Sequence, residues 1–276
     1  MKNNYQITPI IATFNRWDLV KVLVKELAES FHNKAIIIND GGDAIPEDDL
    51  NYFKKYADII NLDTNIGQAK ATFKGAEQVK TSHMLIIDSD DLIETKSLDR
   101  ILSKLNDTDI FLPKDIFHRN KIRERKLNHS LTVKDLRKNS IGANSGIIIP
   151  TKVFQRHGIY RFNLTSCIDW EMYIRFYKSG IKFKTYPGMI KYNIETEGIS
   201  RNLQKVYLGR CELWKLHPDI FSALHRPFDL LRLLKYSSAN CAIKKTEYIS
   251  LSFQFFRFFH SIGRCIFLLV YKSFKK

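Results

Sequence analysis

The chain has 276 residues, enough to bury a full core as one large or two small domains. Its formal charge of +15 indicates an anionic partner, which could be nucleic acid, a phosphorylated substrate or an anionic membrane. The four cysteines have no paired spacing that would indicate zinc or a redox centre, and no signal peptide precedes the first predicted strand, so we expect a cytoplasmic protein.

The first part of the sequence alternates buried strands with amphipathic helices. Strands are predicted at residues 7–12, 35–38, 59–62 and from 84 onward, and helices at residues 17–31 and 68–79. This alternation predicts a doubly wound α/β fold, in which a mostly parallel, Rossmann-like sheet is flanked by helices.

After Asp91 the regular alternation ends. We expect a helix at 95–105, a strand at 110–112, a basic surface loop with a short helix at 114–138, and a strand at 146–149. A short helix begins at 153, and a longer one follows Cys167. Short strands are predicted at 182–186 and 189–192, around Pro187 and Gly188. A polar loop and a helical remainder from about residue 203 complete the chain.

An apolar run that begins at Met84 ends abruptly at three carboxylates, those of Asp88, Asp90 and Asp91. Ligands of open α/β sheets bind outside the carboxyl ends of the strands, where these acids are expected. Close carboxylates repel one another unless a cation or a donor relieves them, and hard oxygen ligands suit magnesium or manganese. The alternative is that one of these acids only caps the next helix, but three together favour a metal or nucleotide site.

A further acid, Asp169, stands at the amino end of the helix that follows Cys167. There its carboxylate can cap backbone amides or face the cleft, and the residue types alone leave both possibilities open.

The carboxyl-terminal quarter carries most of the net charge. Residues 201–276 contain 14 Lys and Arg but only four Asp and Glu, which accounts for +10 of the +15. Residues 251–271 are apolar on one helical face, but Arg257 and Arg264 disfavour a membrane span. The pattern suits a helix lying in the interface of an anionic membrane, or a last helix packed on the protein's own core. Nucleic-acid binding is not expected, because no recognised nucleic-acid module accompanies the basic residues.

Five separated pieces of the sequence, in order between about Thr8 and Arg201, together resemble the inverting glycosyltransferases of family two. They are Pro9–Arg16, Asn39–Gly42, Asn65–Gly67 with Gly75, Asp88–Asp91, which matches the DXD motif, and Ile168–Glu171. The sequence departs from the family pattern at Asn39, at Thr72 and Phe73, at Ile168, and at Glu195 in the presumed closing loop.

The resemblance implies a GT-A fold and assigns different functions to different parts of the chain. Residues 1–200 would form the catalytic domain, with a nucleotide-sugar half at 1–112 and an acceptor half at 113–200, and residues 201–276 a helical, basic, membrane-associating extension. It also implies that Asp169 is the catalytic base and that Asp90 and Asp91 are the leading candidates to bind Mn²⁺ or Mg²⁺. The implied donor nucleotide-binding residues are Ala12, Thr13, Asn15, Asp40, Asp88 and Asp90.

The implied function is metal-dependent, inverting transfer of a sugar from a nucleoside diphosphate, with UDP-sugars favoured. The acceptor would be a hydroxyl of a glycan or lipid-linked molecule in bacterial surface polysaccharide or lipopolysaccharide synthesis, at the inner face of the cell membrane. The alternative is a noncatalytic nucleotide-sugar or polyanion-binding module, which would explain the departures but has no use for Asp169 beside an intact DXD motif. A nucleotidyltransferase is a weaker alternative, because residues 12–16 contain no glycine.

Overall fold

The structure is a computed structural model that describes residues 5–95, 98–118, 121–125, 127, 131–138, 141–142, 145–192, 202–222, 225–226 and 229. The backbone divides into two compact units, one of Met1–Phe162 with Ile168–Thr196 and the other of Asn163–Cys167 with Glu197–Lys276. Each unit is described by itself. The interfacial helix expected at residues 251–271 lies outside the described residues, as does Glu195.

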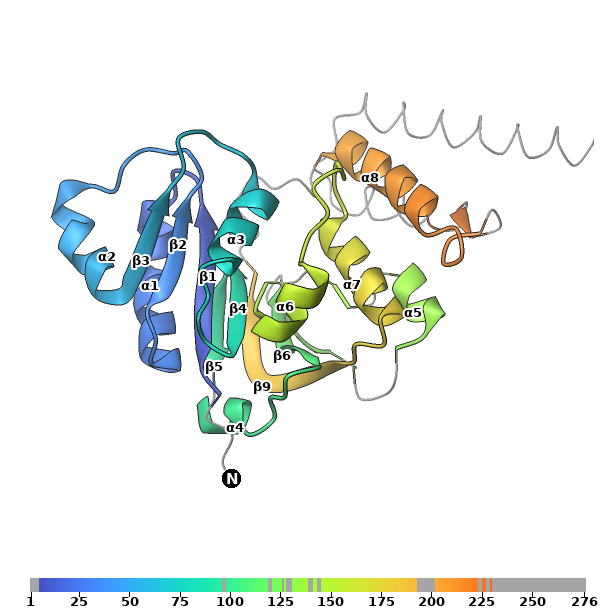
Figure 1. Ribbon diagram of the computed structural model, residues 1–276, viewed down its shortest axis with the longest axis horizontal. Coiled ribbons are helices and arrows are strands. Elements are labelled where there is room, and N and C mark those ends of the chain that lie inside the picture. Colours follow the sequence, from blue (N-terminus) through green and yellow to red (C-terminus); the bar gives the residue numbers. More distant parts are fainter. Residues whose placement is uncertain are drawn as a thin grey trace, which may run out of the picture. The chain divides into compact units, whose positions relative to one another are not determined.

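The first unit is built on a nine-stranded mixed sheet (Figure 1). Its strands are β1 (Ile7–Thr13), β2 (Ala35–Asn39), β3 (Ala57–Asn61), β4 (His83–Asp88), β5 (Leu92–Thr95), β6 (Ile110–His118), β7 (Lys121–Glu124), β8 (Ile147–Pro150) and β9 (Phe183–Lys191). The strand order is β3-β2-β1-β4-β8-β6-β9-β5, and β7 pairs with β6.

The four strands predicted from the amino-terminal part form the parallel half of this sheet. β1 pairs in parallel with both β2 and β4, and β2 pairs in parallel with β3. All seven residues of β1 are buried, as the uninterrupted apolar run predicts for a strand that is covered on both faces. The carboxyl ends of all four strands therefore lie at one edge of the sheet.

The described residues of the first unit form seven α-helices. They are α1 (Trp17–Phe31), α2 (Leu50–Tyr56), α3 (Gln68–Ala76), α4 (Leu98–Leu102), α5 (Val133–Arg137), α6 (Thr151–His157) and α7 (Ile168–Lys178), with a 3-10 turn, η1, at Glu47–Asp49. The α1 side chains share a buried core with Ile11 and Ile37. The opposite face of the same strands meets α3 at Gly75, where an added Cβ would lie 2.4 Å from Ile38 and 2.8 Å from Ile10. Gly75 therefore permits α3 to approach the sheet closely.

The structure corrects the predictions for the second half of the unit. Strand β5 at residues 92–95 was not predicted, and the helix expected at 95–105 is shorter, α4 at Leu98–Leu102. The expected surface loop at 114–138 contains the end of β6 and the whole of β7, together with the expected short helix, α5. The two strands expected at 182–186 and 189–192 are one continuous strand, β9. A register shift against β6, between Pro113 and Asp115, accommodates Pro187 and Gly188 within β9.

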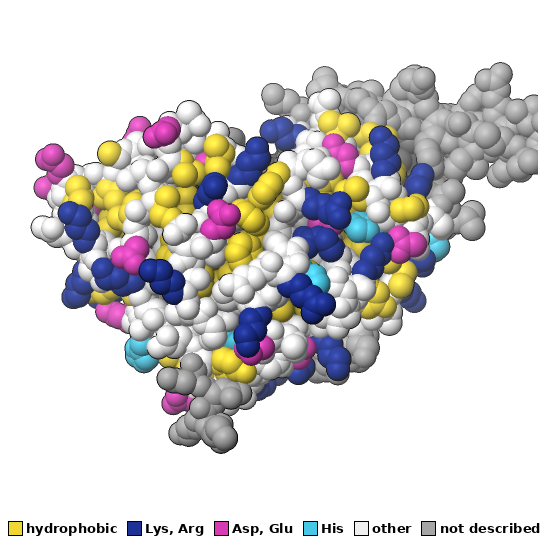
Figure 2. Space-filling view, viewed as in Figure 1, with side chains coloured by type: hydrophobic (Ala, Val, Ile, Leu, Met, Phe, Trp, Pro, Cys, Tyr) yellow, Lys and Arg dark blue, Asp and Glu magenta, His cyan; other side chains and the backbone are white. Residues whose placement is uncertain are grey.

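The described part of the second unit centres on helix α8 (Leu203–Leu216), which begins where a helical remainder was predicted. The Asn202 side chain caps its first turn. Glu212 on this helix accepts hydrogen bonds from the backbone and hydroxyl of Thr165. Within the described residues, no helix is long and apolar enough to cross a membrane. On the face drawn in Figure 2, basic side chains are interspersed with acidic ones.

Candidate active site

The register of the parallel strands brings predicted site residues together at the carboxyl edge of the sheet. Ala12 is paired with Asp88 of β4, and Thr13 with Asn39 of β2. The Thr13 side chain is only 2% exposed, and its hydroxyl has no hydrogen-bond partner among the described residues. A buried unpaired hydroxyl at this edge is a polar group that a bound ligand can satisfy.

The turn after β2 is organised by Asn39, which is 3% exposed. Its amide nitrogen donates to the carbonyls of Gly42 and Asp43, at 3.3 and 3.1 Å, and its amide oxygen accepts from the Gly42 backbone. A carboxylate has no N–H to donate, so the Asn that replaces the family's acid has a structural reason in this chain. The exposed Asn15 closes the same turn by accepting from the Asp43 backbone at 2.6 Å.

Asp40 lies inside this turn and is also 3% exposed. Its two carboxylate oxygens accept from the backbone amides of Ile66 and Gly67, at 2.8 and 3.0 Å. Asp40 therefore fixes the loop that leads into helix α3. Contact between Asp40 and a nucleobase stays a prediction.

The acidic motif at the end of β4 is strongly self-repelling. The pKa of the Asp88 carboxyl is raised to about 7, first by burial and then by the negative charges of Asp91, Asp90 and Asp169. A hydrogen bond from the Gln68 amide, at 2.6 Å, opposes this rise. The interaction between Asp88 and Asp169 shows that the fold brings together acids that are 81 positions apart in the sequence.

Two neighbours of the acidic motif were not predicted as site residues. Arg16 forms an ion pair with Asp90 at 2.9 Å, and Gln68 is the first residue of α3, directly after Gly67. Arg16 belongs to the piece that resembles the family's opening strand and loop, so its sequence position was a signal. The amide of Gln68 offered no such signal, because its contact with Asp88 depends on how α3 packs on the sheet.

Asp169 is half-buried in the first turn of α7. One of its oxygens, Oδ1, accepts from the Trp170 backbone at 2.8 Å, so the capping interaction expected as an alternative is present. Burial raises the pKa of this carboxyl above its ordinary value, although the backbone hydrogen bond lowers it in part. Because its charge also reaches Asp88, Asp169 both caps its helix and belongs to the acidic group at the sheet edge.

Helix α7 is held in place by buried polar contacts. The Trp170 indole donates to the Leu136 carbonyl at 2.5 Å. The carboxylate of Glu171, which is fully buried, forms ion pairs with Arg161 at 3.0 Å and with Arg175 at 3.3 Å. Arg175 in turn donates to backbone carbonyls of the segment that follows α6. These contacts fix the helix that carries Asp169.

The residues present fit a divalent cation by their chemistry. Asp88, Asp90 and Asp91 offer hard carboxylate oxygens, and the pKa of Asp88 is raised by burial and by the negative charges of its neighbours, which a cation would offset. In the described part of the chain, no group of three or more His, Cys, Asp or Glu side chains is already arranged around a common point.

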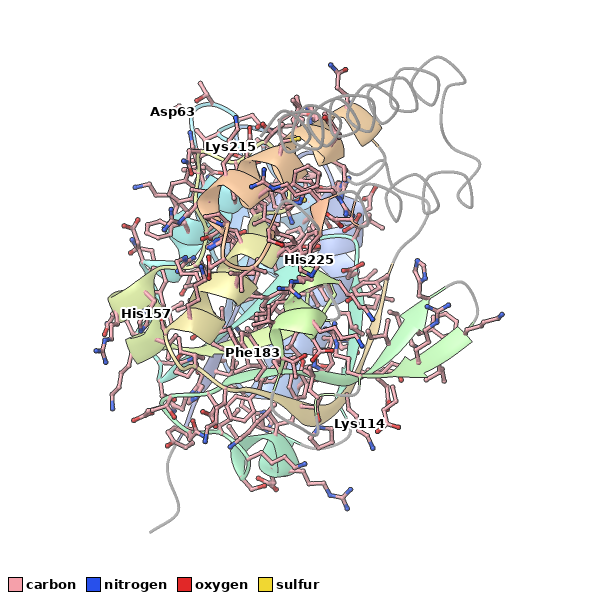
Figure 3. All side chains as sticks on the ribbon, turned by 90° about the vertical axis from the view of Figure 1, so that its right-hand side faces the viewer. Asp63, Lys114, His157, Phe183, Lys215 and His225 are labelled. Carbon is pink, nitrogen blue, oxygen red and sulfur yellow. The ribbon has the colours of Figure 1, made fainter. Side chains whose placement is uncertain are left out.

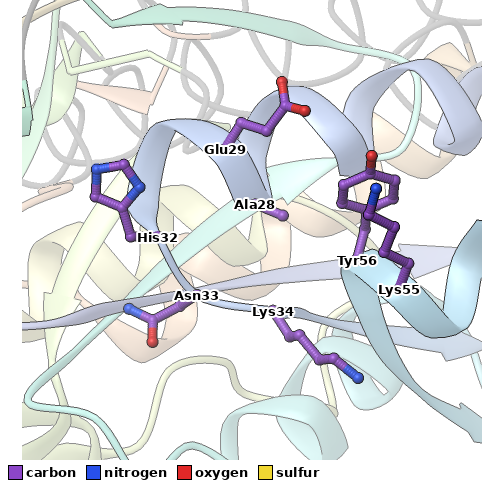
Figure 4. A pocket seen from close by; sticks show the side chains of 7 residues that line it. All are labelled: Ala28, Glu29, His32, Asn33, Lys34, Lys55 and Tyr56. Carbon is purple, nitrogen blue, oxygen red and sulfur yellow. The ribbon is translucent and has the colours of Figure 1, made fainter.

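A shallow hollow of about 230 Å³ lies elsewhere on the unit, lined by the end of α1, the turn after it and the end of α2 (Figure 4). It is lined by Ala28, Glu29, His32, Asn33, Lys34, Lys55 and Tyr56. These residues precede β2 and β3, at the opposite end of the strands from the carboxylates, so the hollow is not part of the candidate active site.

Comparison with known proteins identifies the family. Residues 8–163, more than half of the chain, match Glycosyl transferase family 2. The chain belongs to this family. That finding confirms the resemblance inferred from the five sequence pieces.

The chain is also similar to a polymerase of teichoic acid. It is 25% identical over 162 residues to the teichoic acid poly(glycerol phosphate) polymerase of Staphylococcus epidermidis, which covers 54% of this chain but only 22% of the relative. The chain thus spans about a fifth of that protein's length.

Solved structures of S. aureus TarS share the fold. The complex of TarS 1-349 with UDP-GlcNAc superposes with a TM-score of 0.59 at 15% identity, over 93% of this chain and 73% of the other. The complex with UDP gives a TM-score of 0.56 at 15% identity, over 89% and 75%. These likenesses confirm the predicted GT-A fold.

We predict that Asn39→Asp destabilises the protein. A carboxylate at this position would face the carbonyls of Gly42 and Asp43 without a donor, which costs about 1–3 kcal/mol for buried groups. Chemical denaturation would measure the loss.

Asn61→Asp is the matched control, because the Asn61 side-chain oxygen only accepts from Asn39 and a carboxylate oxygen can replace it. Equal stability of the two variants would contradict the assigned role of Asn39.

Proposed function

We propose that this chain is a metal-dependent, inverting glycosyltransferase that moves a sugar from a UDP-sugar to a hydroxyl of a cell-surface polysaccharide or its lipid-linked precursor. Membership of the glycosyltransferase family supports the reaction class. The donor is supported by the likeness of the chain to TarS, whose complexes with UDP-GlcNAc and UDP are known, and the polymer by its likeness to the teichoic acid polymerase.

The observation that carries this proposal is the meeting of Asp169 with the acidic motif of β4. In an inverting transfer, the acceptor oxygen attacks the sugar carbon from the face opposite the diphosphate. The bond from that carbon to the diphosphate oxygen breaks, and the acceptor proton goes to a base. We assign the base to Asp169, whose Oδ1 is anchored by the Trp170 amide and whose Oδ2 would take the proton.

The raised pKa of Asp169 suits this role, because a carboxylate that binds a proton more strongly is a better general base. Its position at a helix amino end fixes its orientation without a side-chain partner. In this way the capping interaction and the catalytic role support each other.

On the donor side, we assign the nucleotide to the carboxyl edge of β1, β2 and β4, with Ala12, Thr13, Asn15, Asp40, Asp88 and Asp90 as its binding residues. The unpaired Thr13 hydroxyl supports this placement. Asp90 and Asp91 would hold Mn²⁺ or Mg²⁺, which supplies positive charge to the departing diphosphate when bound. The hydrogen bond from Gln68 to Asp88 would still hold the start of α3 against the end of β4.

We further propose that the protein associates with the inner face of the cell membrane through residues 251–271, where a lipid-linked acceptor would be reached. The support is the sequence pattern of that segment alone: aromatic and aliphatic residues on one helical face, with Arg257 and Arg264 on the other.

The first test is donor turnover. We expect UDP release from at least one UDP-sugar in a panel that includes UDP-GlcNAc, GDP-sugars and dTDP-sugars, assayed with manganese and with poly(glycerol phosphate) as acceptor. Chelation of the manganese should abolish turnover. Binding of UDP-sugars without any turnover would favour the noncatalytic binding module.

Asp169→Asn should abolish turnover while leaving donor binding and thermal stability nearly intact. The Asn side-chain oxygen can still cap the Trp170 amide, but it cannot take a proton, and general-base help is typically worth about 10² to 10⁴ in rate. Steady-state kinetics and calorimetric UDP binding would measure the two effects separately.

The wild-type rate should also fall on the acid side of a pKa that lies above that of an ordinary Asp, since the base must be ionised and burial raises its pKa. An Asp169→Asn variant that turned over at the wild-type rate would rule out Asp169 as the base.

Asp91→Ala should weaken metal-dependent donor binding by about tenfold or more, because it removes one carboxylate from the predicted cation site. Isothermal titration of UDP in the presence of manganese measures this directly. Asp99→Ala is the control, since Asp99 is an exposed acid of α4 and its loss changes the net charge equally. Unchanged affinity in Asp91→Ala would remove Asp91 from the metal site.

A further inference from the structure

Tyr173 is a fully buried tyrosine whose hydroxyl has no hydrogen-bond partner among the described residues. Buried hydroxyls almost always have a partner, because an unpaired one destabilises the folded state. The contrast with Tyr186 is clear: it is equally buried, and its hydroxyl donates to the Gly146 carbonyl at 2.7 Å. The Tyr173 hydroxyl is therefore an unused donor and acceptor inside the unit.

Its position in helix α7 relates Tyr173 to the predicted base. It follows Asp169 by four residues, a spacing that places two side chains on the same face of a helix. Side chains in helices lean toward the amino terminus, so the Tyr173 ring extends over the turn that carries Asp169. The ring is fixed edge-on against the buried Phe183, with 5.6 Å between ring centroids; Phe183 begins β9 (Figure 3).

The charges around the hydroxyl define what it can bind. Burial raises the pKa of Tyr173 well above its ordinary value, so the hydroxyl keeps its proton and can donate. The charges of Arg125 and Asp169 both act on it, as does the hydroxyl of Tyr192. Arg125 is 5% exposed and donates to the Tyr192 hydroxyl at 3.0 Å. A neutral, oxygen-bearing ligand beside Asp169 suits these surroundings.

We propose that the Tyr173 hydroxyl donates a hydrogen bond to the attacking oxygen and holds it against Asp169. This inference rests on the proposed function. An alcohol or water oxygen has two lone pairs: one would accept from Tyr173, and the other would form the bond to the sugar carbon. Its proton would pass to Asp169. Tyr173, Asp169 and the sugar carbon of the donor would thus fix three of the directions around the attacking oxygen.

The test is Tyr173→Phe in the full chain, compared with the matched variant Tyr186→Phe. For Tyr173→Phe we expect an unchanged or higher Tm, because the substitution removes an unpaired buried hydroxyl, together with about a five- to tenfold lower kcat. UDP affinity should not change. For Tyr186→Phe we expect the opposite pair of results: a Tm lower by several degrees, because the Gly146 carbonyl loses its donor, and an unchanged kcat.

The assay is release of the nucleoside diphosphate from UDP-GlcNAc, or from whichever sugar nucleotide of the panel turns over fastest, with poly(glycerol phosphate) as the acceptor. A Tyr173→Phe variant with a wild-type kcat would overturn the inference and leave the proposed function standing. Absence of turnover in the wild-type protein with every donor would instead overturn the proposed function, and this inference with it. A lower UDP affinity in Tyr173→Phe would show that the hydroxyl serves the donor rather than the attacking oxygen.

Discussion

Repulsion among four carboxylates is the constraint on which the candidate site depends. Burial first, and then the negative charges of Asp91, Asp90 and Asp169, raise the pKa of Asp88 to about 7. Arg16 offsets part of this charge through Asp90. Burial and like charges make such an arrangement costly for the protein that carries it, and in our proposal a cation that arrives with the substrate offsets that cost.

The role of each acid follows from the donors around it rather than from its residue type. Asp40 accepts from two backbone amides and serves as a loop anchor, whereas Asp169 accepts from one and keeps an oxygen for chemistry in our proposal. Asn39 completes the series, because its place requires donors and an acid could not supply them. A family motif describes these positions only by residue type. Hydrogen-bond geometry distinguishes the residues that anchor a loop from the residue that we assign to catalysis.

The sequence was sufficient for the parts of the fold that depend on local patterns. The parallel half of the sheet, helices α1 and α7 and the carboxyl-edge position of the acids all follow from runs of apolar residues that end in polar ones. Strand β5 was missed because it is four residues long and its partner in the described sheet, β9, lies 93 to 99 positions later in the chain. Likewise β9 was divided at Pro187, since only pairing with β6 reveals the irregularity that keeps the strand continuous.

The same distinction between local and distant information explains which site residues the sequence could not supply. Tyr173 shares a helix face with Trp170 and Ile174, and helical spacing assigns all three to the core, where the structure indeed places them. What distinguishes Tyr173 is an absence: no described residue satisfies its hydroxyl.

An absent partner can be found only when every neighbour is known, so no pattern in the sequence could indicate it. If the hydroxyl does hold the attacking oxygen, then α7 supplies both the base and the group that aims the nucleophile at the donor. In our proposal the donor is bound at the parallel strands, so the angle of attack would be set by how α7 packs on β9, through the contact of Tyr173 with Phe183. A substitution at Phe183 would then change the rate without touching the substrate.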